Sequence, residues 1–180
     1  MGGSAPVDPK SNEADFQTES TKRYYEDTNA QKTISNTKKL STVNQQDFDA
    51  IFYPGGHGPM WDLATDKNSI ALISSFFQHD KPVALVCHGP AALVNVKTAK
   101  GDYLIRGKRV SGFSNTEEHA VQLTNVVPFS LENTLSERGA TYERGANWSS
   151  FVVTDGLLIT GQNPQSSQAV AEKLLSKLNP

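Results

Sequence analysis

Residues 81–93, KPVALVCHGPAAL, carry the clearest structural pattern in the sequence. An apolar run with β-branched residues begins after Pro82 and reaches Cys87, the only cysteine, where the sequence changes to small residues that suit a helix. This pattern predicts a buried strand, a sharp turn and a helix. In such a turn the side chain between strand and helix projects above the sheet, beside the helix N-terminus. We therefore expect Cys87 to be exposed, with its thiolate favoured.

Two neighbours of Cys87 fit a reactive site. His88 can act as a base or as an electrostatic partner, and Gly89 removes the Cβ that would crowd the turn. A lone cysteine is nevertheless more often a small buried hydrophobic residue than a nucleophile. A second loop, YPGGHG at residues 53–58, follows another short apolar strand and favours the functional interpretation.

The segments around these two loops alternate between strand and helix patterns. We expect strands over residues 48–53 and 82–86 and helices over residues 67–79 and 88–97. This alternation is typical of parallel strands joined by crossover helices. Ligands of such sheets bind outside the carboxyl ends of the strands, where both loops fall.

The remaining segments of the chain carry local patterns of helix, strand and turn. Residues 1–46 are polar, and residues 20–27 are expected to begin a short helix in a surface excursion. An Asp155-Gly156 turn predicts a hairpin over residues 151–160. The other expected elements are β pieces at 103–105 and 109–111 and helices at 116–123, with Asn115 as a cap, at 131–138, ended by Gly139, and at 165–178.

Four motifs resemble those of the ThiJ/PfpI superfamily: DAIFYPGGHG at 49–58, VCHGP at 86–90, VSGFSNTEE at 110–118 and TGQNP at 160–164. Within it, the sequence is most similar to the branch of glutathione-independent glyoxalases, or glyoxalase III, which is heat-shock-protein-like. The resemblance implies the class I glutamine amidotransferase-like fold, a flavodoxin-like three-layer α/β sandwich with a mostly parallel sheet. It implies a single domain over residues 1–180, with a polar excursion at 1–46 and the sheet core at 47–180.

The resemblance also implies a catalytic set. Relatives in this branch pair the cysteine with the next histidine and with an acid in the downstream Gly-Phe-Thr/Ser segment, which gives Cys87, His88 and Glu118 here. The set is chemically reasonable, because a carboxylate bonded to one imidazole nitrogen fixes the tautomer and raises the basicity of the other. Glu117 remains an alternative acid, since the register of a motif in a loop is easily displaced by one residue.

The Gly-rich loop supplies candidates for binding. Backbone N–H groups of Gly55, Gly56 and His88 are suited to stabilising an oxyanion, because glycine lets the backbone approach a ligand closely. His57 is a candidate for binding substrate, and a structural hydrogen bond is an equal alternative. No metal is expected, since no histidine pair has a familiar zinc spacing among His57, His79, His88 and His119.

Composition limits the remaining classes of function. The 180 residues correspond to about one domain, and 17 basic against 19 acidic residues give no positive field for nucleic acid. No apolar run approaches the roughly 20 residues of a membrane span, and the N-terminus does not resemble a signal peptide. A single cysteine fits a reducing compartment, so we expect a cytoplasmic protein without membrane or nucleic-acid partners.

The sequence departs from the family at its start. Relatives carry a β-α-β unit of roughly 30 residues before the segment that matches Gly2-Gly3-Ser4, whereas this chain begins at Met1. In the family that unit supplies a central strand and a glutamate bonded to the cysteine. We therefore expect an N-terminally shortened sheet with an exposed edge, covered either by another chain or by residues 1–46.

The resemblance implies an enzyme that converts methylglyoxal to lactate without glutathione or another cofactor. Cys87 would attack the aldehyde of a small carbonyl substrate, and deglycase or hydrolase activity would be a close neighbour. The alternative is a non-catalytic redox-sensing or chaperone-like stress protein. Glutamine amidotransferase activity is disfavoured, because no histidine lies two residues before a glutamate. Relatives are often dimers, so a homodimer is compatible with the resemblance.

Overall fold

The computed structural model describes residues 2–179, and the chain forms two compact units, Met1–Val43 and Asn44–Pro180. The sequence placed the end of the polar excursion at residue 46, close to this division.

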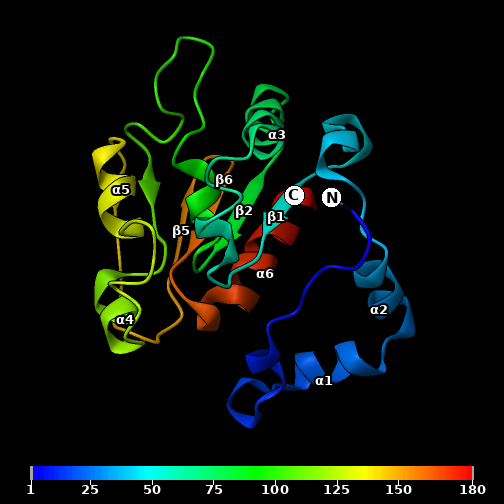
Figure 1. Ribbon diagram of the computed structural model, residues 1–180. Helices are drawn as coiled ribbons and strands as arrows, with labels where there is room; N and C mark the ends of the chain where they lie inside the picture. Colours follow the sequence, from blue (N-terminus) through cyan, green and yellow to red (C-terminus); the bar gives the residue numbers. More distant parts are fainter. Residues whose placement is uncertain (1, 180) are drawn as a thin grey trace. The chain divides into compact units, whose positions relative to one another are not determined.

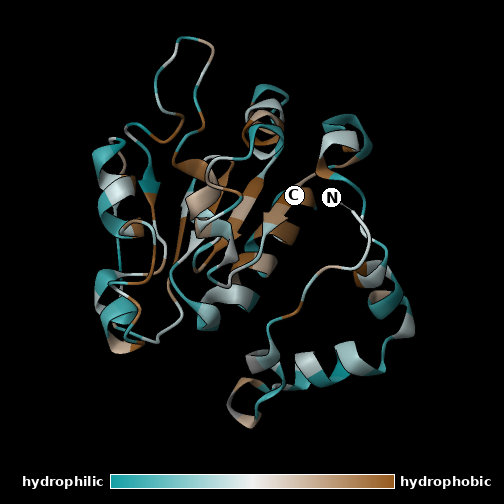
Figure 2. Cartoon of the chain, viewed as in Figure 1, coloured by the Kyte–Doolittle hydropathy of each residue, from teal (hydrophilic) through white to brown (hydrophobic). Residues whose placement is uncertain are grey.

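The first unit contains two short α-helices (Figure 1). Helix α1 spans Glu19–Glu26 and starts at a capping box formed by Thr18 and Thr21. Helix α2 spans Thr28–Ser35, and the Asp27 carboxylate caps it by accepting from two backbone N–H groups. Neither helix carries a buried residue, and both are mainly polar in colour in Figure 2. The helix expected over residues 20–27 is confirmed.

The second unit is built on a four-stranded sheet of order β1-β2-β6-β5. Strands β1 (Ile51–Tyr53), β2 (Val83–Val86) and β6 (Leu158–Gly161) are parallel, and β5 (Val152–Asp155) is antiparallel to β6. Every residue of β2 and β6 is buried, so both faces of the sheet centre are covered. Figure 2 shows these strands in hydrophobic colours. The predicted α/β fold with a mostly parallel sheet is confirmed, and β1 is an edge strand.

Two amphipathic helices pack on this sheet. Helix α3 (Lys67–Gln78) contacts β2 and is capped by Asp66, whose carboxylate accepts from the Ser69 N–H. Helix α6 (Ser167–Leu178) contacts β2 and β6. Both helices were predicted from their apolar periodicity. Their buried apolar side chains are Leu72, Ile73 and Phe76 in α3 and Val170 and Leu174 in α6.

A second, two-stranded sheet pairs β3 (Arg109–Val110) in parallel with β4 (Thr141–Tyr142). Along the chain, β3 and β4 are separated by α4 (Asn115–Ala120) and α5 (Leu131–Glu137). Helix α5 ends before Gly139, as expected. Residues 103–105 do not form a strand with β3, and Tyr103 makes only an isolated bridge to Lys97. The partner of β3 follows a helix instead of a tight turn, which local patterning does not reveal.

Short 3-10 helices span Pro9–Asn12, Ala14–Phe16, Leu40–Thr42, Gln45–Asp47, Gly58–Met60, Gly89–Leu93 and Pro164–Ser166.

The segment after Cys87 differs from its prediction. An α-helix was expected over residues 88–97, whereas the structure has the 3-10 helix Gly89–Leu93. The segment that follows, Val94-Asn95-Val96, has low helix propensity, and the Asn95 side chain donates to the Ala64 carbonyl. The helix-terminus contribution expected at Cys87 is therefore small, because the dipole of so short a helix is weak.

The predicted hairpin is confirmed, with Gly156 at its turn in the left-handed region at φ 60°. Strand β1 is shorter than expected: it begins at Ile51, three residues later than predicted. Among residues 2–179, none of the helices combines the length and apolar character required to cross a bilayer.

Candidate active site

Cys87 lies in a strained turn directly after β2. Its φ of 61° is in the left-handed region, which is costly for a residue with a side chain. Two backbone hydrogen bonds hold it there: the Cys87 N–H donates to the Gly161 carbonyl at 3.0 Å, and the Phe113 N–H donates to the Cys87 carbonyl at 2.9 Å. The sharp turn expected from the sequence is therefore fixed by two segments distant along the chain.

The environment of Cys87 corrects one prediction. The side chain was expected to be exposed with a favoured thiolate, yet the residue is only 5% exposed. Burial raises the pKa of the Cys87 thiol to about 12, and this outweighs two backbone N–H groups that lower it. The resting group at neutral pH is thus a thiol, which needs a base to become a nucleophile.

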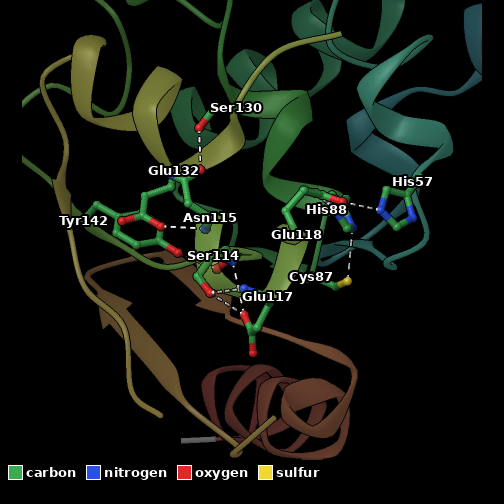
Figure 3. Close-up of polar contacts among 11 residues, drawn as sticks. His57, Cys87, His88, Ser114, Asn115, Glu117, Glu118, Ser130, Glu132 and Tyr142 are labelled. Carbon is green, nitrogen blue, oxygen red and sulfur yellow. Dashed lines mark hydrogen bonds and ion pairs between the residues drawn. The ribbon is translucent and has the colours of Figure 1, made fainter. Parts of the chain in front are cut away.

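His88 is placed to be that base. Its Nδ1 lies 3.3 Å from Cys87 Sγ, and its Nε2 lies 2.7 Å from Glu118 Oε2 (Figure 3). Burial lowers the pKa of His88 to about 4, although the hydrogen bond to Glu118 acts in the opposite direction. With Nε2–H donating to the carboxylate, the neutral ring directs its Nδ1 lone pair at the thiol. The arrangement can move a proton from sulfur to nitrogen.

The two adjacent glutamates have different surroundings. Glu118 reaches His88, whereas Glu117 points elsewhere (Figure 3). The carboxylate of Glu117 accepts from the Ser114 N–H and hydroxyl, from the Trp148 N–H and from the Asn163 amide. Burial raises the pKa of Glu117, but these hydrogen bonds outweigh burial and leave the pKa below its ordinary value. Glu117 is therefore a buried anchor between three segments, and it is Glu118 that contacts the histidine.

Glu117 also determines how α4 begins. Ser114 caps the helix in a capping box with Glu117, so the cap lies one residue before the expected Asn115. Asn115 instead contacts α5, since its N–H donates to Glu132 and its side chain donates to Asn133. The capping box fixes the rotation of α4 and thereby directs Glu118 toward His88.

The glycines of both loops allow the backbone to pass close to Cys87. A Cβ on Gly55 would lie 2.7 Å from the Cβ of Cys87, and one on Gly89 would lie 2.6 Å from the Tyr53 carbonyl oxygen. Neither position can accept a side chain without displacing its neighbour. The backbone N–H groups of Gly56 and His88 both reach Sγ. Two donors therefore converge beside the sulfur, in the region where an oxyanion would form.

His57 contacts the other oxygen of Glu118. Its Nε2 lies 2.9 Å from Oε1, and its ring lies over that of His88 with centroids 3.8 Å apart. The three potential ligand atoms of His57, His88 and Glu118 lie within 4.8 Å of one another. Tetrahedral zinc would hold ligand atoms roughly 3.3 Å apart, whereas the two histidine–glutamate pairs lie at hydrogen-bond distances of 2.9 and 2.7 Å. We therefore assign the cluster to hydrogen bonding.

Sequence reasoning missed two aromatic residues at the site. The Phe113 ring lies 4.3 Å from that of His88, and the Trp148 ring lies 5.8 Å from that of Phe113. Trp148 is 40% exposed and has a left-handed φ of 60°, held by the bond from its N–H to Glu117. Phe113 lies within the Gly-Phe-Ser motif and could have been noted there. Trp148 carried no signal, because its contact depends on the fold.

The fold and the site together define a class of proteins: α/β proteins with a cysteine on a strained turn after a central parallel strand, next to a histidine oriented by a carboxylate. Comparisons of the sequence and the structure with known proteins agree with this class. The family model described as DJ-1/PfpI family matches residues 12–177, so the chain belongs to the DJ-1/PfpI family. The resemblance stated from the motifs is confirmed.

Several relatives within the family are similar over most of the chain. Glyoxalase 3 of Candida albicans is 31% identical over an alignment of 170 residues, which covers 90% of this chain and 72% of that protein. The glutathione-independent glyoxalase HSP31 of Saccharomyces cerevisiae is 30% identical over 84% of this chain and 67% of its own length.

Solved structures show the same similarity. Rapid Encystment Protein 24 kDa of Francisella tularensis superposes with a TM-score of 0.94 at 40% identity, covering 99% of this chain and 78% of its own. Glyoxalase III of Candida albicans superposes with a TM-score of 0.88 at 31% identity, covering 95% and 75% of the two chains.

Proposed function

We propose that the chain is a glutathione-independent glyoxalase that converts methylglyoxal to lactate, with Cys87 as nucleophile. The observation that carries the proposal is the continuous contact from Cys87 Sγ through His88 to Glu118, at 3.3 and 2.7 Å. The relatives named as glutathione-independent glyoxalases support it. A small electrophilic carbonyl compound is the proposed substrate class, and no cofactor takes part.

The first step is addition to the aldehyde. His88 Nδ1 takes the proton of the Cys87 thiol, and the sulfur forms a bond to the aldehyde carbon. The carbonyl oxygen becomes an alkoxide, which the N–H groups of Gly56 and His88 stabilise until it takes up the proton from His88. The product is a hemithioacetal with neutral His88. Because Cys87 and His88 both start neutral, the buried site holds no thiolate–imidazolium pair before the reaction.

The second step moves hydrogen between adjacent carbons. Neutral His88 removes the proton from the former aldehyde carbon, which gives an enediolate, and returns it to the neighbouring carbon. The hydroxyl proton on the first carbon moves to the oxygen of the second, so the first carbon becomes a carbonyl and the second an alcohol. The first carbon is then a thioester of lactate on Cys87. Water cleaves the thioester, which releases lactate and one proton and restores the thiol. Thioester cleavage also accounts for the proposed deglycase or hydrolase side activity on small acyl compounds.

The burial of Cys87 disfavours the alternative of a redox sensor. Sensor cysteines are accessible and have low pKa values, whereas Cys87 is buried with a pKa raised to about 12. The proposed chemistry requires a free thiol, which a reducing compartment such as the cytoplasm maintains. We therefore propose an enzyme of the cytoplasm that removes reactive carbonyl compounds under stress.

The test is turnover of methylglyoxal by the purified chain without glutathione. We expect lactate to form, and Cys87→Ala and His88→Ala to reduce its formation at least about a hundred-fold, while circular dichroism shows that both variants fold. A folded wild-type chain that forms no lactate would contradict the proposal. So would lactate formation that survives in Cys87→Ala.

A further inference from the structure

The Glu118 carboxylate is shared between two histidines. Oε2 pairs with His88 Nε2 at 2.7 Å, and Oε1 pairs with His57 Nε2 at 2.9 Å. In Figure 3 the Glu118 carboxylate contacts both imidazoles, which lie against each other, and His88 also contacts Cys87. Each oxygen has its own histidine, so the carboxyl group cannot rotate without breaking one of the bonds. We propose that His57 is a positioning residue, which acts through Glu118 on the Cys87–His88 pair.

The exposure of the three side chains supports this inference. His88 is 1% exposed, Glu118 9% and His57 31%. The network therefore leads from a buried thiol to a residue that solvent can reach. His57 comes from the Gly-rich loop, whereas Glu118 comes from α4 and His88 from the cysteine turn. The hydrogen bond thus ties the loop to the acid, and the inference rests on the proposed function for its role in catalysis.

The electrostatics around His57 give this role a measurable consequence. The described groups that face His57 are the Glu118 carboxylate, the His88 imidazole and the uncharged Phe113 ring. A positive charge on His57 opposes a second one on His88 and lowers the pKa of His88. Removing His57 also leaves Glu118 interacting with His88 alone. Both effects raise the pH at which His88 gains its proton.

Two variants separate the hydrogen bond from the bulk of the side chain. His57→Phe keeps a ring against His88 and loses the N–H donor. His57→Gln offers an amide N–H at about the reach of Nε2 and cannot ionise near neutral pH. We expect His57→Phe to lower kcat about ten- to hundred-fold, the effect of a hydrogen bond to a charged group. KM should change little, and His57→Gln should recover most of kcat.

A second readout does not require turnover. Alkylation of Cys87 by iodoacetamide needs the thiol to lose its proton, and the single cysteine makes the product unambiguous. The alkylation rate should increase with pH as His88 loses its proton. This increase, the acid limb of the pH profile, should lie at higher pH in His57→Phe than in the wild type, because the pKa of His88 rises. A purely structural role would leave this limb in place. If the wild type shows no turnover, the proposed function fails, and the alkylation profile still tests the network.

A double-mutant cycle completes the experiment. If His57 acts mainly through Glu118, His57→Phe should have a much smaller effect on the alkylation rate once Glu118→Ala is present, because only the direct charge effect of His57 on His88 remains. The inference is overturned if His57→Phe matches the wild type in kcat and in alkylation profile. It is also overturned if His57→Gln is as impaired as His57→Phe, or if the two mutations act additively.

Discussion

Burial displaces the pKa values of Cys87 and His88 in opposite directions. It raises that of the thiol to about 12 and lowers that of the imidazole to about 4, so both residues are neutral at pH 7. A thiolate–imidazolium pair at rest is therefore disfavoured in this site. The nucleophile forms only when its proton passes to His88, in the presence of an electrophile that accepts the charge of the sulfur.

The thiol gives a prediction about stability. The Cys87 pKa is raised from its ordinary value of 9.0 to about 12, so between these values the unfolded chain has lost a proton that the folded chain retains. The free energy of unfolding should fall as pH rises through this window, by about 2 kcal/mol between pH 9 and 11. Urea unfolding at both pH values measures it. Cys87→Ala is the control, and an equal loss in that variant would contradict the prediction.

The neighbouring glutamates give a second prediction. Glu118→Gln should lower kcat about a hundred-fold or more with a small effect on stability, because the charge beside His88 is lost. Glu117→Gln should lower the free energy of unfolding by about 1–3 kcal/mol, because an amide NH2 would face two hydrogen-bond donors. Thermal unfolding and methylglyoxal kinetics on both variants measure this. Loss of kcat in a fully stable Glu117→Gln would reverse the assignment of the acid.

At the scale of elements, the site exists because the loop after β1 passes close to the turn after β2. Gly55 packs against Cys87, and Gly89 packs against the Tyr53 carbonyl. The two parallel strands place both loops at their carboxyl ends, and the glycines remove the side chains that would separate them. The Gly56 N–H and the His57 ring reach the reacting groups for this reason.

The loop gives a third prediction. Gly55→Ala should abolish most turnover, since its methyl group would lie 2.7 Å from the Cys87 Cβ and force the loop or the turn to move. Gly58→Ala is the matched control, because a Cβ there meets nothing within 4 Å. Lactate formation and thermal unfolding of both variants test the contact. Wild-type turnover in Gly55→Ala would show that the loop is not constrained as described.

The elements that sequence predicted well are those with a local pattern. The apolar run of β2, the periodicity of α3 and the Asp-Gly turn between β5 and β6 each carry their own signal. The burial of Cys87 carried none, because it depends on distant segments such as Phe113 and Gly55. The choice between Glu117 and Glu118 likewise depends on a capping box that sets the rotation of α4.

At the scale of the whole molecule, the two units differ in burial. Helices α1 and α2 contain no buried residue, whereas all residues of β2 and β6 are buried. Amide protons of α1 and α2 should therefore exchange with solvent at least about a hundred-fold faster than those of β2 and β6, through local opening. Hydrogen exchange followed by mass spectrometry measures the difference. Equal protection of the two sets would contradict this account.

In the proposed mechanism, the buried thiol of Cys87 converts methylglyoxal to lactate without glutathione. The most direct measurement is proton nuclear magnetic resonance of methylglyoxal mixed with the folded wild-type chain or with Cys87→Ala. We expect methylglyoxal to disappear and lactate to appear in the first sample, with no lactate above the buffer rate in the second. Equal lactate in both samples, or none from the folded wild type, would contradict the proposed mechanism.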